Sequence, residues 1–325
     1  MAVLTDAPIL AAAARPFAGL LCRVPTPFAD DESLDLESLG RAVRLSAAVG
    51  VDALSILGEF GEAERLTESE TLAVVRTAVD AAGPLPVIVD AAQTGTAARV
   101  AFARQIFDLG AAAIGLTVPI AFDEPRFRHG VERLANGVAL PIVLSEAPGL
   151  HRDPRSKDFV ARLALDTSSI VSILTDLTAG AQRVGALRDG LRGGGRAITV
   201  LGRLEPFLSR FDESFAPDGI VIGLAFPEVA RSVLDALRDV ETKHTATVDA
   251  SRAATVLLSR ETDSSLIKEV LRQRRLFTSS QVRHPGVRAD EAAIRYVRHL
   301  VGAVLSDADL GRVVDPTPRP FLVNI

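Results

Sequence analysis

The sequence predicts an α/β protein whose main part is a (β/α)8 TIM barrel, followed by a small C-terminal helical extension. Short apolar runs of the kind that form buried parallel strands alternate with longer amphipathic segments of helical length. Eight such runs occur before the alternation stops, and alternating β and α segments of this length are typical of a parallel barrel. The 325 residues, 48% of them hydrophobic, are enough to build one such barrel.

The predicted strands follow one another along the first two thirds of the chain. The first lies near Leu20. The other seven are expected at residues 54–57, 86–89, 114–118, 142–144, 170–174, 197–201 and 220–224. Helix-length segments separate them, and one opens at Thr67-Glu68-Ser69-Glu70, which has the form of a capping box.

The alternation ends after Phe226-Pro227, and the remaining sequence has the pattern of helices. The clearest helices are expected at residues 250–276 and 289–305, before a proline-rich tail. We therefore expect three parts: an N-terminal extension at 1–18, the barrel at 19–227, and the helical extension and tail at 228–325.

Charge and composition exclude several classes of protein. A net charge of −5 and a pI near 5.6 give no footprint for nucleic acid or for an anionic membrane surface. No apolar run reaches the roughly 18 to 20 residues that cross a bilayer, and the first residues lack a signal-peptide pattern. The single cysteine, Cys22, suits a reducing compartment and is expected to pack in the first strand. We therefore expect a cytoplasmic protein that acts on a small molecule.

The loop after the second predicted strand reads Leu57-Gly58-Glu59-Phe60-Gly61-Glu62. It resembles the Gly-Thr-Thr-Gly-Glu signature of the dihydrodipicolinate synthase and N-acetylneuraminate lyase family, with Glu59 and Phe60 at the two threonines. Other segments resemble family landmarks in the same order, namely Thr26-Pro27-Phe28, residues 110–119, residues 140–148 and Val282-Arg283-His284-Pro285. The resemblance implies a (β/α)8 barrel, lyase or aldolase chemistry, and a homo-dimer or homo-tetramer.

The same resemblance places different residues at the family's reactive positions. Leu174 stands where the imine-forming lysine is expected, and Ser145-Glu146 stands where the family has a Tyr-Asn pair. The whole chain has three lysines, Lys157, Lys243 and Lys268, and none falls in a predicted strand. An imine-forming lysine must be desolvated or lie beside other cations, and no sequence surroundings here indicate this. We therefore expect no Schiff-base mechanism.

Candidate site residues are those at the carboxyl ends of the predicted strands, where barrels of this kind build their active sites. Carboxylates stand at five ends, and Arg203 is the one obvious cation among the candidates. The catalytic candidates are Glu59, Asp90, Glu146 and Asp176, with Glu205 as the fifth acid. The candidates for substrate binding are Thr26, Phe60, Thr117, Ser145, Leu174, Thr175, Arg203 and Phe226.

These carboxylates are open to several interpretations. They could coordinate Mg²⁺ or Mn²⁺, act as acid and base, or bind an amine or a polyol. They could also cap helices or form ion pairs with Arg65, Arg99 or Arg203. Glu59 would repel an anionic ligand by roughly 4 kcal/mol at about 4 Å. It must therefore turn away, be protonated or pair with Arg203, or else the ligand is not a simple pyruvate-like anion.

Two functions from different classes follow. The first is a lyase or aldolase that acts on a small carbonyl compound without a lysine Schiff base, and it predicts a closed polar pocket with converging acids. The second is a non-catalytic homologue that binds a small molecule or has a structural role. It predicts acids that arginines already neutralise, or a plugged barrel mouth.

Overall fold

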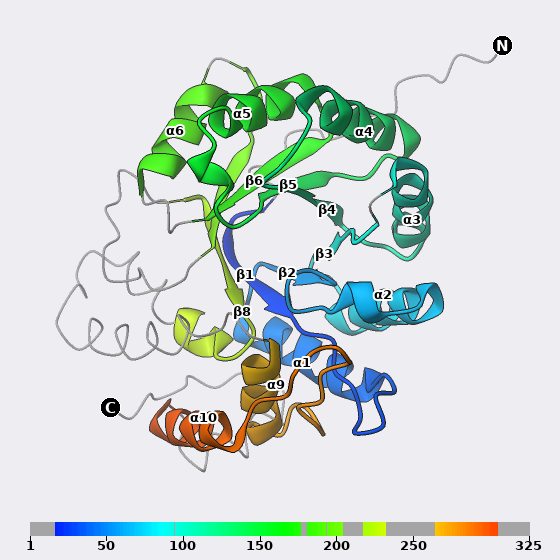
Figure 1. Ribbon diagram of the computed structural model, residues 1–325, viewed down its shortest axis with the longest axis vertical. Coiled ribbons are helices and arrows are strands. Elements are labelled where there is room, and N and C mark those ends of the chain that lie inside the picture. Colours follow the sequence, from blue (N-terminus) through cyan, green and yellow to red (C-terminus); the bar gives the residue numbers. More distant parts are fainter. Residues whose placement is uncertain are drawn as a thin grey trace.

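A computed structural model of the protein describes residues 17–93, 95–176, 181–192, 194–203, 217–231 and 264–304. Eight parallel strands close into a barrel in the order of the sequence, and β8 pairs with β1 (Figure 1). The strands are β1 (Gly19–Val24), β2 (Ala53–Ile56), β3 (Val87–Asp90), β4 (Ala113–Val118), β5 (Ile142–Glu146), β6 (Ile170–Asp176), β7 (Thr199–Arg203) and β8 (Gly219–Gly223). The predicted (β/α)8 barrel is confirmed.

Helices run between the strands and surround the barrel (Figure 1). They are α1 (Leu36–Val49), α2 (Glu68–Ala82), α3 (Thr96–Asp108), α4 (Glu124–Gly137), α5 (Ser156–Asp166) and α6 (Ala181–Leu191), with the short 3₁₀ turns η1 (Ala63–Arg65) and η2 (Leu150–Arg152). Near the C-terminal end of the described chain, α9 (Ser264–Gln273) and α10 (Glu291–Val304) lie inside the two ranges predicted to be helical there. The three-part division itself stays a prediction.

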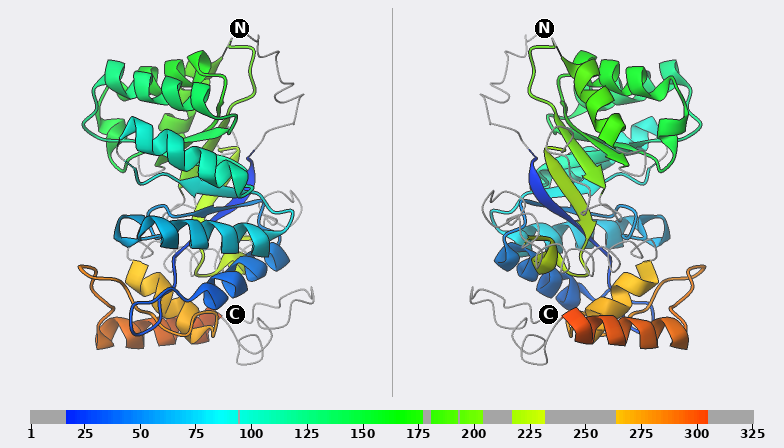
Figure 2. Two further views of the ribbon diagram at one scale, coloured as in Figure 1. Left: turned by 90° about the vertical axis from the view of Figure 1, so that its right-hand side faces the viewer. Right: turned by 90° about the vertical axis from the view of Figure 1, so that its left-hand side faces the viewer.

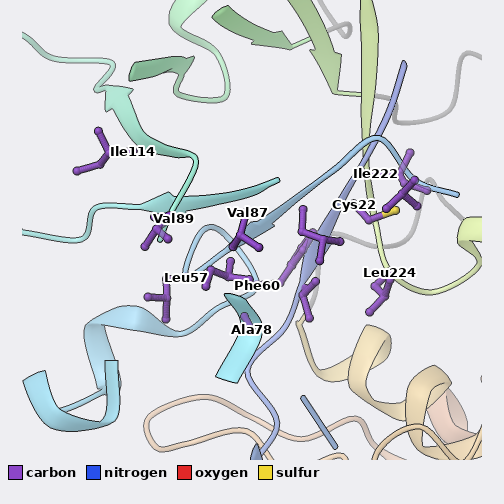
Figure 3. Close-up of a cluster of buried hydrophobic side chains, with 14 of the residues drawn as sticks. Cys22, Leu57, Phe60, Ala78, Val87, Val89, Ile114, Ile222 and Leu224 are labelled. Atoms are coloured by element: carbon purple, nitrogen blue, oxygen red, sulfur yellow. The ribbon is translucent and has the colours of Figure 1, made fainter. Parts of the chain in front are cut away.

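The strands divide their side chains between two apolar clusters, because successive side chains point to opposite faces. Outward-facing residues pack under the helices, and Cys22 lies in this outer cluster with Ile222 and Val89 (Figure 3). Inward-facing residues form a second cluster inside the barrel, which includes Leu21 of β1 and Val221 of β8. The predicted packing of Cys22 in the first strand agrees with this position.

Local signals fix several helix ends. The capping box at the start of α2 forms as predicted, because Thr67 Oγ1 accepts from the Glu70 amide and Glu70 Oε2 accepts from the Thr67 amide. α1 ends at Gly50, whose positive φ of 79° suits glycine, and its amide caps the last turn. None of the described helices is long and apolar enough to cross a bilayer.

α9 packs against α10 at one end of the molecule, beside α1 and away from α5 (Figure 2). Its Lys268 is fully buried, bonds to Glu62 in the loop after β2 and donates to the Gln281 carbonyl at 3.0 Å. Burial lowers the pKa of Lys268 to about 8. The expectation that no lysine is desolvated is therefore wrong for Lys268, since helix packing across a long stretch of chain buries it.

We expect Glu70→Gln to lower the free energy of unfolding at pH 7 by about 1–3 kcal/mol, because it removes a charged partner of Arg283. Glutamine still completes a capping box, so the loss reports the ion pair, in which Arg283 Nη1 donates to Glu70 Oε2 at 2.9 Å. The Arg283 hydrogen bond lowers the pKa of Glu70 to about 2. The stabilisation is therefore present above the ordinary carboxyl pKa and is lost as the pH falls towards 2.

Urea denaturation of both proteins between pH 7 and pH 2.5 measures this difference. Glu37→Gln serves as the matched control, because Glu37 is 83% exposed and its pairing with Arg41 is a surface contact on α1. A difference that stays constant across this pH range would contradict the prediction.

Candidate functional site

A cavity of about 320 Å³ lies at the carboxyl ends of the strands, where barrels of this kind build active sites. Its floor consists of apolar side chains from the barrel interior: Leu21, Ile88, Val143, Leu174, Leu201 and Val221. Its polar lining residues are Arg23, Ser55, Glu59, Asp90, Thr117, Ser145 and Arg203. The volume is at the lower end of the range of roughly 300–1,000 Å³ for ligand pockets, so the cavity suits a small molecule.

The apolar floor and polar wall follow from the two-residue period of the strands. In β1, Leu21 and Arg23 both line the cavity, while Cys22 between them faces the helices. The same order of an apolar and then a polar inward residue recurs at Ala53 and Ser55, Ile88 and Asp90, Val143 and Ser145, and Leu201 and Arg203. The second inward-facing residue of each of these strands is therefore polar, and together these side chains form the polar wall of the cavity.

Asp90, the last residue of β3, is one of the two acidic residues among the described residues that line the cavity, and Glu59 is the other. Burial raises the pKa of Asp90, while the Ser55 hydrogen bond and the charges of Arg23 and Arg203 oppose the rise. Ser55 Oγ donates to Asp90 Oδ2 at 2.6 Å. A carboxyl group with a raised pKa in a cavity is a candidate acid or base.

Two glycines make room for the Asp90 carboxyl group. Gly115 of β4 lies in register with Asp90, and a Cβ there would overlap Asp90 Oδ1. On the other side, a Cβ at Gly58 would lie 2.5 Å from Asp90 Oδ2. A larger residue at either position would force the carboxyl group to move.

Glu59 lies in the loop after β2 and is held by two arginines at the cavity. Arg23 Nη1 donates to Glu59 Oε2 at 2.6 Å, and Arg203 Nη1 lies 3.6 Å from the same oxygen. Of the alternatives open for Glu59, the structure shows pairing with Arg203 and adds a closer partner in Arg23.

The loop that carries Glu59 is fixed by its neighbours in the sequence. Thr26 Oγ1 donates to the Gly61 carbonyl at 2.7 Å, and Phe60 is buried in the outer core with the Arg23 guanidinium 5.9 Å from its ring (Figure 3). Buried Glu62 bonds to Lys268 and accepts from Arg65 Nη1 at 2.8 Å. Thr26 and Phe60 are therefore placed to support the loop, outside the cavity lining.

Glu146 is predicted to be catalytic at the mouth of the barrel, but its side chain does not line the cavity. Because Ser145 faces inward, Glu146 faces the helices, where it is buried, pairs with Arg183 of α6 and accepts from Thr175 Oγ1 at 2.6 Å. Phe226 is also buried outside the cavity lining, under the guanidinium of Arg274. Glu146, Thr175 and Phe226 therefore do not line the cavity, contrary to expectation. The two-residue period of β5 and β6 turns Glu146 and Thr175 towards the helices, and packing after β8 buries Phe226.

The remaining candidates divide as follows. Leu174, Thr117, Ser145 and Arg203 line the cavity, and none of its described lining residues is a lysine. Their role in substrate binding stays a prediction. Asp176 ends β6, but its side chain lies outside the described part of the chain, as does all of Glu205. Within the described ranges, no three histidine, cysteine, aspartate or glutamate side chains could hold a metal ion together. Coordination of Mg²⁺ or Mn²⁺, one of the interpretations open for the carboxylates, therefore has no candidate ligand set in those ranges.

The sequence reasoning missed Arg23 and Ser55. Both stand in runs that read as plain apolar strands, and Arg23 directly follows Cys22. The spacing of Leu21 and Arg23 in the sequence is the signal that identifies Arg23, because residues two positions apart in a strand point to the same face. The cavity therefore has two arginines against Glu59 and Asp90, where the sequence suggested an excess of acids.

A model of the Dihydrodipicolinate synthetase family matches residues 16–178, which is half of the chain and spans β1 to β6. The chain belongs to this family. The L-2-keto-3-deoxyarabonate dehydratase of Azospirillum brasilense is 29% identical over 277 residues, which cover 82% of this chain and 88% of the relative. The 4-hydroxy-tetrahydrodipicolinate synthase of Chlorobium chlorochromatii is 32% identical over 152 residues, covering 46% of this chain and 51% of the relative.

Solved structures of the dihydrodipicolinate synthetase family have the same fold. The dihydrodipicolinate synthase of Rhodopseudomonas palustris has a TM-score of 0.79 at 25% identity, covering 89% of this chain and 98% of that chain. A dihydrodipicolinate synthase variant described as monomeric has a TM-score of 0.78 at 22% identity, covering 89% of this chain and 97% of that chain. The expected homo-dimer or homo-tetramer and the cytoplasmic location stay predictions.

We expect Gly115→Ala to lower the free energy of unfolding by about 1–3 kcal/mol, because the new methyl group overlaps the Asp90 carboxyl group. In the double variant with Asp90→Ala the overlap is gone, so the double variant should be more stable than the sum of the two single effects predicts. Thermal and urea unfolding of the four proteins measure this coupling.

Gly302→Ala is the matched control, because a Cβ at this position in α10 meets open space and alanine favours a helix. It should be neutral or stabilising. Additive losses for the changes at residues 90 and 115 would show that the carboxyl group does not depend on Gly115.

Proposed function

We propose that this protein is a lyase that acts on a small carbonyl compound without forming an imine, with Asp90 as the group that moves the proton. The observation that carries the proposal is the position of Asp90, a carboxyl group with a raised pKa in the cavity at the active end of the barrel. A raised pKa makes the carboxylate a stronger base and its acid form available nearer neutral pH. The same group can therefore accept a proton and return it.

The proposed step is an elimination next to the carbonyl group. Asp90 takes a proton from the carbon beside the carbonyl, and the electron pair of that C–H bond moves towards the carbonyl oxygen. The negative charge that develops there is stabilised by Arg23 and Arg203. The electrons then return to expel a group from the next carbon, and a leaving hydroxyl takes the proton from Asp90 and departs as water.

Among the groups that such an elimination could expel, we propose that this protein expels water. The relative from Azospirillum brasilense is named a dehydratase for a 2-keto-3-deoxy sugar acid, and the similarity extends over most of both chains. Thr117 and Ser145 line the cavity and supply hydroxyl groups that can hold a polyol. The proposal requires neither a metal ion nor an amine. The alternative reaction is carbon–carbon cleavage, in which Asp90 takes the proton of the hydroxyl group on the next carbon, the bond between the two carbons breaks, and the proton returns to the carbon beside the carbonyl.

A non-catalytic binding protein is the second candidate. It is favoured by the pairing of two of the predicted catalytic acids, Glu59 and Glu146, with arginines. The open cavity and the Ser55 hydrogen bond that Asp90 accepts favour the enzyme.

We expect Asp90→Asn to lower the turnover of 2-keto-3-deoxy sugar acids at least about 100-fold, because the amide cannot accept and return the proton. The fold should be as stable as the wild type or more so near pH 7. A raised folded-state pKa means that ionisation of Asp90 costs stability as the pH rises from the ordinary carboxyl range, and asparagine does not ionise. Steady-state assays and thermal unfolding measure the two effects.

Asp166→Asn is the matched control, because Asp166 lies at the end of α5 with a side chain that is 59% exposed. It should leave turnover unchanged. Turnover by Asp90→Asn at the wild-type rate would remove Asp90 from the mechanism, and the lack of any turnover in the wild type would favour the binding protein.

We expect borohydride treatment in the presence of pyruvate to leave every lysine without a reduced adduct. The sequence resemblance aligns Leu174, which lines the cavity, with the lysine of the family, and buried Lys268 is held by Glu62 and the Gln281 carbonyl. Peptide mass spectrometry measures the outcome, with a dihydrodipicolinate synthase treated in parallel as the positive control. An adduct on any lysine of this chain would restore a Schiff-base mechanism.

A further inference from the structure

We propose that Arg23 and Arg203 form a carboxylate-binding site, that Glu59 occupies this site in the free protein, and that a ligand carboxylate binds by displacing Glu59. The inference rests on the proposed function in that it names a ligand class for the same cavity. The binding test below needs no turnover, so the two can fail separately.

The geometry of Glu59 is that of a bound anion. A single oxygen, Oε2, is 2.6 Å from Arg23 Nη1 and 3.6 Å from Arg203 Nη1. The two arginines come from β1 and β7, which both pair with β8. β8 has Gly223 in register with Arg23, so it contributes no side chain beside Arg23, and it has Val221 of the cavity floor in register with Arg203. The two guanidinium groups therefore converge on one point at the cavity.

Both arginines are held independently of Glu59. Arg23 is buried in β1 beside the ring of Phe60. Arg203 ends β7, and its Nη2 donates to the Glu146 carbonyl at 3.1 Å. Guanidinium groups placed by strands of a closed barrel keep their positions when the anion between them is exchanged.

Arg203 also has hydrogen-bonding capacity to spare. Its Nε is buried and has no hydrogen-bond partner among the residues that the structure describes. A buried donor that is left unpaired destabilises the free protein, and a partner for it is a gain on binding. A ligand carboxylate has two oxygens that can bind a guanidinium side by side, whereas Glu59 offers one oxygen at 3.6 Å from Arg203.

Glu59 is suited to leave. It lies in a loop and its side chain is 35% exposed, so it can turn towards water when another carboxylate takes its place. Exchange of one carboxylate for another keeps the two arginines neutralised, which their burial requires. A ligand also gains apolar contact with the cavity floor, which includes Leu174 and Val143.

Ligand-observed NMR titration with propionate tests the site, because propionate reproduces the end of the glutamate side chain. We expect Glu59→Ala to bind propionate at least about tenfold more tightly than the wild type, since a tethered competitor acts at a millimolar or higher effective concentration. Propionamide, which has the same shape without the charge, should bind neither protein. The gain should disappear in E59A/R203M.

Glu64→Ala is the matched control, because Glu64 lies nearby in the chain, is 66% exposed and pairs with Arg65 outside the cavity. It should bind propionate as the wild type does. Circular dichroism melting checks that each variant is folded, and E59A/R203Q replaces E59A/R203M if the latter is not.

The proposal is overturned if Glu59→Ala binds propionate no more tightly than the wild type, or if the gain survives the loss of Arg203. A tighter propionate complex that depends on Arg203 supports it, whatever Asp90→Asn does to turnover. A loss of turnover in Asp90→Asn would support the proposed function independently of the result of the propionate titration.

Discussion

The site is organised around a charge inside a barrel strand. Arg23 lies in β1 between residues that pack in the core, and a buried guanidinium group needs an anion close to it. Glu59 supplies that anion from the loop after β2. The loop must then hold Glu59 at the cavity while Phe60 turns into the core. Gly61 permits this turn, since a Cβ there would overlap the backbone of Leu57.

The same charge acts on Asp90. Burial alone would raise the pKa of this carboxyl group further, but Arg23 and Arg203 oppose the rise, and Glu59 adds to it. Displacement of Glu59 by an uncharged group would remove one negative charge that favours the protonated form of Asp90, whereas a ligand carboxylate would replace that charge. The protonation of Asp90 is thus linked to whatever anion lies between the two arginines.

Much of the barrel can be predicted from the sequence, because local patterns of apolar residues specify its strands. The strands, the capping box at Thr67 and the place of Leu174 at the cavity all follow from short-range signals. The side chains at the mouth were less readable. The predicted site includes both Ser145 and Glu146, although adjacent strand residues face opposite ways. Applying this period to β1 would have found Arg23 as well.

Burial of Lys268 could not be read in the same way. Its partner Glu62 is 206 residues away in the chain, and only the packing of α9 against the loop after β2 brings the two together. No periodicity within α9 encodes such a contact. The pair matters for the site, because Glu62 also accepts from Arg65 and so anchors the loop that places Glu59.

Changes at different strands of this cavity depend on one another. Leu174 lines the cavity and none of the described lining residues is a lysine, so the polar side chains that a ligand can meet there carry hydroxyl, carboxyl and guanidinium groups. Asp90 fits only because Gly58 and Gly115 have no side chains beside it. Arg23 fits only with an anion such as Glu59. A set of side chains that accommodate one another and leave a cavity open is what binding of a ligand requires, and a barrel filled only for stability would have no need of it.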